Sequence, residues 1–271
     1  MKKIGRIFIT LSLMLPLFAA CSEKEPAETG EGQQSPTAEI PESDPGEANF
    51  AIINVRGFGE ITVKLYPEYA PKTVERFTEN VRSGFYTGRN FHRVISDFMI
   101  QGGSFDGNGG GDPNVTGIKT ETHPDANHYY GAFCLAANTL GEGSDSFYIV
   151  NSKDTGAYEK RIRDVEEELR QITAEEASYR AMYGDKAVDE AIEMLNDILD
   201  NVTPEAKARY AESGGTPQLD GGYTVFGYTI DGFDVIDAIS AVEVVNNGRG
   251  EISKPTQDII IEWVILKTNI D

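Results

Sequence analysis

Residues 91–103 read FHRVISDFMIQGG, a segment rich in apolar residues that ends in two glycines. Its two apolar halves, 91–95 and 98–101, each predict a short strand. Similar β-rich runs predict further strands at 50–56, 60–66, 131–136, 146–150, 223–228 and 258–267. Many short strands with only two helices between them predict a closed β-barrel or a β-sandwich.

Two helices accompany these strands. Ala70 and Pro71 begin the first, because proline is favoured in the first helical turn, and Gly84 ends it. The second covers 232–241, where apolar side chains recur on one face.

An insertion at 157–213 interrupts the β pattern. Apolar side chains recur at intervals of three, four and seven residues, which predicts one helix over 158–182 and a second over 188–199. Thr203 and Pro204 predict the N-cap and first turn of a third helix. We expect this all-helical insertion to be either a coiled-coil surface for a partner or, as we favour, a helical hairpin packed on itself and on the barrel.

The 91–103 segment resembles the signature of the cyclophilin-type peptidyl-prolyl cis–trans isomerases. Further blocks resemble the same family and keep its order, at 70–74 (APKTV), 108–111 (NGGG), 131–138, 145–150 and 219–227 (LDGGYTVFG). The resemblance implies one isomerase domain over 50–268, interrupted by the insertion. It implies a mainly β fold, an eight-stranded antiparallel β-barrel closed by two helices, with the active site on one outer face.

The resemblance also implies which residues act. Arg93 becomes the catalytic residue, and the substrate-binding surface becomes His92, Phe98, Met99, Gln101, Gly109, Ala136, Ala137, Asn138, Tyr148, Leu219 and Tyr223. An arginine suits the reaction, because its rigid, permanently charged fork can stabilise the nitrogen lone pair that appears as an X-Pro bond twists. This chemistry requires no nucleophile, metal or cofactor.

Three positions depart from the family pattern. Ser146 stands where a glutamine is expected, which shortens a hydrogen-bonding arm. Gln218 replaces a frequent tryptophan, so we expect weak affinity for cyclosporin. Tyr223 replaces the rim histidine, as in bacterial members of the family. None of these changes removes Arg93, so we expect activity to be retained.

The N-terminus predicts export. Lys2, Lys3 and Arg6 precede a mostly apolar run, and the whole of 1–20 is typical of a signal peptide. The ending LFAAC resembles a bacterial lipobox, which implies a lipid on Cys21. Residues 21–49 are acidic and proline-rich and predict a disordered tether. We therefore expect an exported lipoprotein, anchored to a membrane on its extracytoplasmic side; an ordinary signal peptide with an incidental cysteine is the alternative.

Composition excludes several classes of function. A net charge of −20 argues against nucleic acid as a partner. Two cysteines and three histidines leave little for a metal centre, and we expect none. Cys134, flanked by apolar residues in a predicted strand, indicates a buried inert residue rather than a reactive thiol. The glycine run 107–111 lacks the ending of a phosphate-binding loop and indicates a surface turn.

Two functions follow from these features. The first is an isomerase acting on proline-containing polypeptides, most simply as a monomer. The alternative is a catalytically weak module that binds proline-containing segments without turnover. The insertion carries 15 acidic and eight basic residues between 157 and 212. We therefore expect it to control which polypeptides enter, disfavouring acidic ones.

Overall fold

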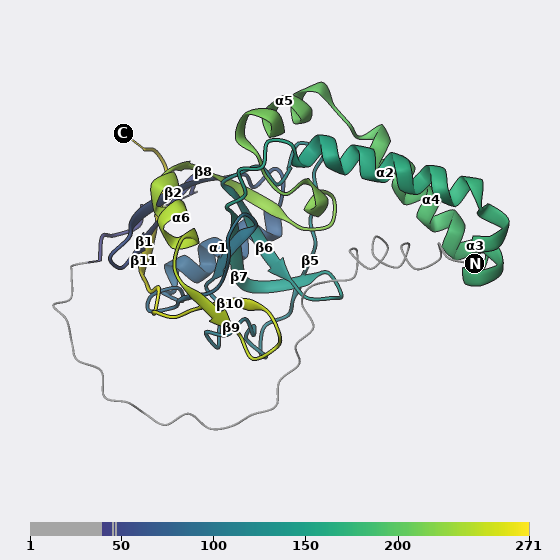
Figure 1. The fold of residues 1–271 in the computed structure, drawn as a ribbon. Helices are drawn as coiled ribbons and strands as arrows, with labels where there is room; N and C mark the ends of the chain where they lie inside the picture. The colour runs from purple at the N-terminus through teal and green to yellow at the C-terminus, as the bar shows by residue number, and fades with distance from the viewer. Residues whose placement is uncertain (1–39, 45, 47, 271) are drawn as a thin grey trace.

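The computed structural model describes residues 40–270 apart from 45 and 47; the predicted signal peptide, Cys21 and most of the predicted tether lie outside the described residues. Its centre is an antiparallel sheet (Figure 1). Eight strands follow one another in hydrogen-bonded order: β11 (Ile261–Lys267), β1 (Phe50–Val55), β2 (Gly59–Leu65), β8 (Val225–Asp231), β6 (Ala132–Ala137), β7 (Glu142–Val150), β4 (Met99–Gly102) and β3 (Phe91–Ile95). The short β5 (Ile118–Lys119) pairs with β7 beside this path.

The sheet curls until its two ends meet. Asn90, just before β3, forms a bridge with Ile260, just before β11. Backbone hydrogen bonds of 2.8 Å from Gly88 and 2.9 Å from Phe91 join the same two segments. The expected eight-stranded antiparallel architecture with a helical insertion is therefore confirmed.

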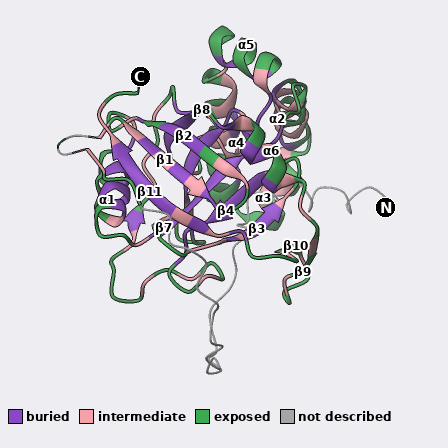
Figure 2. Cartoon of the chain, turned by 90° about the vertical axis from the view of Figure 1, so that its left-hand side faces the viewer, coloured by how far each residue is buried: buried purple, intermediate pink, exposed green. Residues whose placement is uncertain are grey.

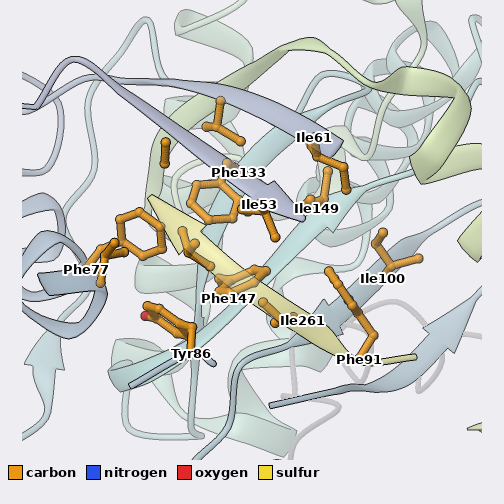
Figure 3. Close-up of a cluster of buried hydrophobic side chains, with 14 of the residues drawn as sticks. Ile53, Ile61, Phe77, Tyr86, Phe91, Ile100, Phe133, Phe147, Ile149 and Ile261 are labelled. Carbon is orange, nitrogen blue, oxygen red and sulfur yellow. The ribbon is translucent and has the colours of Figure 1, made fainter. Parts of the chain in front are cut away.

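The interior of the curled sheet is filled by side chains from alternate strand positions. In β1 every second residue is buried, which is the pattern of a strand with one face on a core. Aromatic rings, among them Phe133 and Phe147, meet at its centre among aliphatic side chains (Figure 3). The ring centroid of Phe133 lies 4.9 Å from that of Phe147 and 4.5 Å from that of Phe226. Two helices, α1 (Pro71–Arg82) and α6 (Phe233–Ser240), add their apolar faces to this core.

The predicted insertion contains four helices rather than three. They are α2 (Ala157–Ala174), α3 (Glu176–Tyr183), α4 (Asp185–Asp200) and α5 (Pro204–Ser213). The single helix predicted over 158–182 is wrong, because Glu175 leaves the helical conformation (φ −118°, ψ 26°) and separates α2 from α3. The break lets α3 as well as α2 pack against α4, around the buried side chains of Val165, Ile172, Val188 and Leu195.

The insertion is anchored to the barrel through α5. Tyr210 is fully buried, with its ring 4.7 Å from Tyr158 of α2 and 4.6 Å from Tyr129 of the barrel domain. Its hydroxyl donates to Asp220 at 2.7 Å. Beyond this anchor, α2, α3 and α4 extend as an arm whose outer surfaces are exposed (Figures 1 and 2).

A small exposed hairpin was not predicted. It consists of β9 (Val244–Asn246) and β10 (Ile252–Pro255) and contacts β3. In β10 the apolar Ile252 is exposed and the polar Ser253 is buried, and in β9 no residue is buried, so the hydrophobic pattern of the sequence does not predict this hairpin. The hairpin matters because Glu251 lies in it.

Candidate active site

β3 and β4 place two predicted site residues side by side. The turn between them holds Asp97 at φ 57°, a left-handed conformation that aspartate adopts more readily than most residues. The antiparallel register then sets Arg93 opposite Gln101. The Arg93 Nη1 donates to Gln101 Oε1 at 3.3 Å and lies 3.7 Å from Met99 Sδ. With Arg93 only 8% exposed, these contacts fix its guanidinium on the hairpin.

A carboxylate from a distant part of the chain completes the hold on Arg93. The two carboxylate oxygens of Glu251 accept hydrogen bonds from Arg93 Nε and Nη2, each at 2.7 Å. Bidentate pairs of this kind are strong and fix the orientation of the guanidinium plane. Hydrogen bonding by Arg93 lowers the pKa of Glu251 from its ordinary value, so the pair is charged at neutral pH.

A groove of about 1090 Å³ adjoins the β3–β4 hairpin. Six of the predicted binding residues line it: Phe98, Met99, Asn138, Tyr148, Leu219 and Tyr223. The predicted residue Ala136 packs in the same apolar cluster as Met99 and Tyr148. Since the sulfur of Met99 also touches Arg93, the fixed guanidinium lies at the edge of an apolar groove.

The other predicted binding residues lie beside the groove, outside its lining. His92 packs beneath the glycine loop, with Nδ1 3.4 Å from Ser104 Oγ, and a Cβ at Gly109 would come within 3.3 Å of its Nε2. Burial, together with the nearby charge of Arg93, lowers the pKa of His92 to about 4, so this imidazole is neutral at pH 7. Ala137 is buried in β6, opposite Gly143.

Asp220 organises a polar network under the groove. One of its carboxylate oxygens accepts from the backbone N–H of His128 at 2.8 Å and lies 2.9 Å from the His128 Nδ1. The Nε2 atom of His128 lies 3.0 Å from the hydroxyl of Tyr148, and the other Asp220 oxygen accepts from Tyr210. Through these hydrogen bonds the network connects Tyr148 and the loop next to Leu219, which both line the groove, to Tyr210 of the insertion.

Sequence reasoning missed three residues of this arrangement. Asp220 lies within the LDGG block, next to the predicted binding residue Leu219, and could have been singled out there. His128 has no motif around it. Glu251 is 158 positions from Arg93 in the chain and carries no local signal at all.

The three departures from the family pattern have different structural results. Gln218 and Tyr223 line the groove, where the Tyr223 ring stands perpendicular to Tyr148 at 6.4 Å. Ser146 is buried, and among the described residues its hydroxyl has no hydrogen-bond partner. Ser146 does not line the groove, so the hydrogen-bonding arm expected from a glutamine is missing from the site.

The structure also describes the residues that the sequence offered for a reactive thiol, a phosphate-binding loop and a metal site. Burial raises the pKa of Cys134 well above its ordinary value, so its thiol stays protonated. Residues 107–111 form the turn over His92. Within 40–270, apart from 45 and 47, no group of three or more His, Cys, Asp or Glu side chains is placed to hold a metal ion.

Comparison with known proteins identifies the fold and the family. The family model described as "Cyclophilin type peptidyl-prolyl cis-trans isomerase/CLD" matches residues 50–265. The chain belongs to the cyclophilin-type peptidyl-prolyl isomerases. It is 33% identical over 209 residues to a Staphylococcus haemolyticus protein named provisionally as a peptidyl-prolyl cis–trans isomerase, covering 76% of this chain and 85% of that one. A Staphylococcus aureus (strain N315) protein of the same name is 32% identical, covering 76% and 86%.

Solved structures support the fold. A Cryptosporidium parvum cyclophilin type isomerase, crystallised in the presence of the dipeptide Ala-Pro, aligns with a TM-score of 0.51 at 20% identity, covering 81% of this chain and 99% of that chain. A second structure of the same parasite protein gives a TM-score of 0.52 at 19% identity, covering 83% and 100%. At such identities the likeness concerns the fold.

Glu251 provides a test of how this cyclophilin orients its arginine. We expect Glu251→Gln to lower kcat for an X-Pro tetrapeptide about threefold to tenfold, about 0.7–1.4 kcal/mol, because the amide cannot accept from both arginine donors. KM should stay within about twofold, since Glu251 does not line the groove. Glu262→Gln, which removes the partner of the exposed Arg56, is the matched control and should change neither value. An unchanged kcat in Glu251→Gln would show that the pair has no part in orienting Arg93.

Proposed function

We propose that this chain accelerates cis–trans isomerisation of X-Pro bonds with Arg93 as its catalytic residue. The observation that carries the proposal is the guanidinium, immobilised by Gln101 and Glu251 at the edge of the groove that Met99 lines. A fixed donor beside an apolar pocket is what the twisted amide requires. The pyrrolidine ring needs an apolar surface, and the imide nitrogen needs a hydrogen-bond donor.

The proposed reaction forms and breaks no covalent bond of the substrate; it only rotates the X-Pro bond. Resonance gives the planar X-Pro bond a barrier of about 18–20 kcal/mol. As the bond twists, resonance is lost and the nitrogen regains its lone pair, to which an Arg93 N–H donates. That interaction is stronger in the twisted state than in either planar state, so it lowers the barrier. Phe98, Met99 and Leu219 hold the proline ring meanwhile.

A protease-coupled assay separates the isomerase from the alternative, a module that binds proline segments without turnover. The full chain is added at catalytic concentration to an X-Pro tetrapeptide whose trans form alone is cleaved. We expect the slow phase, which takes tens to hundreds of seconds uncatalysed, to accelerate in proportion to enzyme. Saturable binding of the peptide with an unchanged slow phase would favour the binding module.

The proposal extends to where the enzyme works. The signal-like residues 1–20, the lipobox-like LFAAC and the acidic 21–49 segment support export and attachment through a lipid on Cys21. None of the described helices is long and apolar enough to cross a membrane. The clients are then proline-containing polypeptides that fold outside the cytoplasm.

Cys21→Ser tests the anchor. We expect the variant to lose incorporation of labelled fatty acid and to leave the membrane fraction, because a serine cannot form the thioether of a lipoprotein. Cys134→Ala removes the buried cysteine of the barrel and is the control; it should remain labelled and membrane-bound. Membrane pelleting of Cys21→Ser at the level of the parent protein would overturn the lipid assignment.

A further inference from the structure

The groove is built by two parts of the chain. One wall is the barrel face with Phe98, Tyr148 and Tyr223, where the proposed proline site lies. The other wall belongs to the insertion, through Ile162 of α2 and Met194 of α4. When the proline of a polypeptide occupies the barrel side of the groove, the residues that flank the proline therefore lie next to the insertion.

The insertion wall is strongly acidic. Glu190, Glu193 and Asp197 lie on one face of α4, three and four residues apart, and all three are exposed and line the groove. Asp125 adds a carboxylate from the barrel side. Among the lining residues the one lysine or arginine is Arg161, and Glu168, Asp164 and Asp220 lie near enough to offset its charge.

Several carboxylates of the insertion are paired with basic side chains. Arg180 bridges Glu176, Asp185 and Asp189, and Lys207 bridges Glu159. Of the three groove carboxylates of α4, Glu190 pairs with the exposed Lys186 at 3.3 Å, whereas in the described part of the chain no ion pair involves Glu193 or Asp197. Two unpaired like charges four residues apart destabilise a helix, and a bound cation would relieve that cost. The groove face thus has the charge of a binding surface for a cationic ligand.

We infer that this groove selects proline-containing polypeptides that carry two basic residues close to the proline. The inference rests on the proposed isomerase function and adds its substrate class. Glu193 and Asp197 are about 6 Å apart along the axis of α4, at about 1.5 Å per residue. Two residues at positions i and i+2 of an extended chain are about 6.6–7 Å apart, so a Lys-X-Lys segment matches the two carboxylates.

The same charges disfavour the chain's own N-terminal segment as the occupant. Residues 22–48 contain four prolines but eight acidic residues and one lysine. An acidic segment meets repulsion at α4, whereas a basic segment meets attraction and is steered toward the site.

Three peptides with one Ala-Pro core test the inference, flanked on both sides by Lys-X-Lys, by Glu-X-Glu or by Ser-X-Ser. Isomerisation is followed by NMR exchange, which needs no protease with charge preferences of its own. At low salt the full chain should show a kcat/KM about tenfold higher for the lysine peptide than for the glutamate peptide. Raising the salt to about 0.5 M should reduce the ratio to about twofold, because exposed charges are then screened.

Two charge-matched variants locate the effect. The groove variant Glu190→Gln/Glu193→Gln/Asp197→Asn should reduce the low-salt ratio to about twofold. The control variant Glu166→Gln/Glu212→Gln/Asp200→Asn removes the same charges from exposed positions of the insertion outside the groove and should keep the full ratio. Retention of the ratio in the groove variant would overturn the inference, as would a ratio near one in the parent protein.

The serine peptide distinguishes a failure of the proposed substrate class from a failure of the proposed isomerase function. If the parent protein turns it over but does not distinguish lysine from glutamate, the isomerase stands and the substrate class is wrong. If the parent protein does not turn over the serine peptide either, the proposed function itself fails.

Discussion

Arg93→Ala lowers kcat/KM for an X-Pro tetrapeptide at least tenfold, a loss of about 1.4 kcal/mol of transition-state stabilisation. The reason is that Gln101 and Glu251 fix this guanidinium beside the apolar groove, where it can donate to the twisted imide nitrogen. The measurement is the protease-coupled assay on the purified full chain. Far-ultraviolet circular dichroism of the variant should match the parent, since the Arg93 side chain contacts Met99, Gln101 and Glu251 and does not fill the central apolar core.

Two companions make the Arg93 result interpretable. Arg93→Lys keeps a positive charge but loses the planar fork, so it should recover less than half of the lost activity. Arg56→Ala removes an exposed arginine that also pairs with a glutamate, and it should leave kcat/KM unchanged. Activity of Arg93→Ala equal to that of the parent would remove Arg93 from the mechanism.

Tyr210→Ala lowers the free energy of unfolding by about 3–5 kcal/mol, the range for deleting a buried aromatic ring. Its ring is fully buried between Tyr129 and Tyr158, and its hydroxyl donates to Asp220. The substitution therefore leaves a cavity between the insertion and the barrel. Urea unfolding followed by intrinsic fluorescence and by circular dichroism measures the loss.

Tyr210→Phe separates packing from hydrogen bonding. It keeps the ring and deletes the bond to a carboxylate, so it should cost about 1.5–3 kcal/mol. Tyr183→Ala removes a tyrosine that is 41% exposed on α3 and should cost less than about 1 kcal/mol. A loss below about 1 kcal/mol for Tyr210→Ala would mean that the insertion is not anchored through this residue.

The barrel could be predicted because its signals are local. Strands such as β1 alternate buried and exposed residues, and Pro71 and Gly84 bound the first helix where the sequence places them. The 91–103 segment also carries its own register, so Arg93 and Gln101 face each other across one hairpin. Residues within one hairpin stay neighbours whatever the rest of the chain does.

The remaining parts depend on contacts that no local pattern encodes. Glu251 reaches Arg93 only because the β9–β10 hairpin packs on β3, and β10 buries the polar Ser253 while it exposes the apolar Ile252. The helix break at Glu175 is likewise tertiary. Apolar spacing continues through it, yet α3 must turn for Tyr179 to join the small core of the insertion. Tertiary packing overrides periodicity at both places.

The most direct test of the account is an exchange measurement on an Ala-Pro peptide, with no protease present. Two-dimensional NMR exchange spectra resolve the cis and trans forms, and uncatalysed exchange over tens to hundreds of seconds is too slow to give cross-peaks. With the full chain at a small fraction of the peptide concentration, the account predicts strong cis–trans cross-peaks, and an exchange rate at least tenfold lower when Arg93→Ala replaces the parent protein. Absence of cross-peaks with the parent protein, or equal cross-peaks with both proteins, would contradict it.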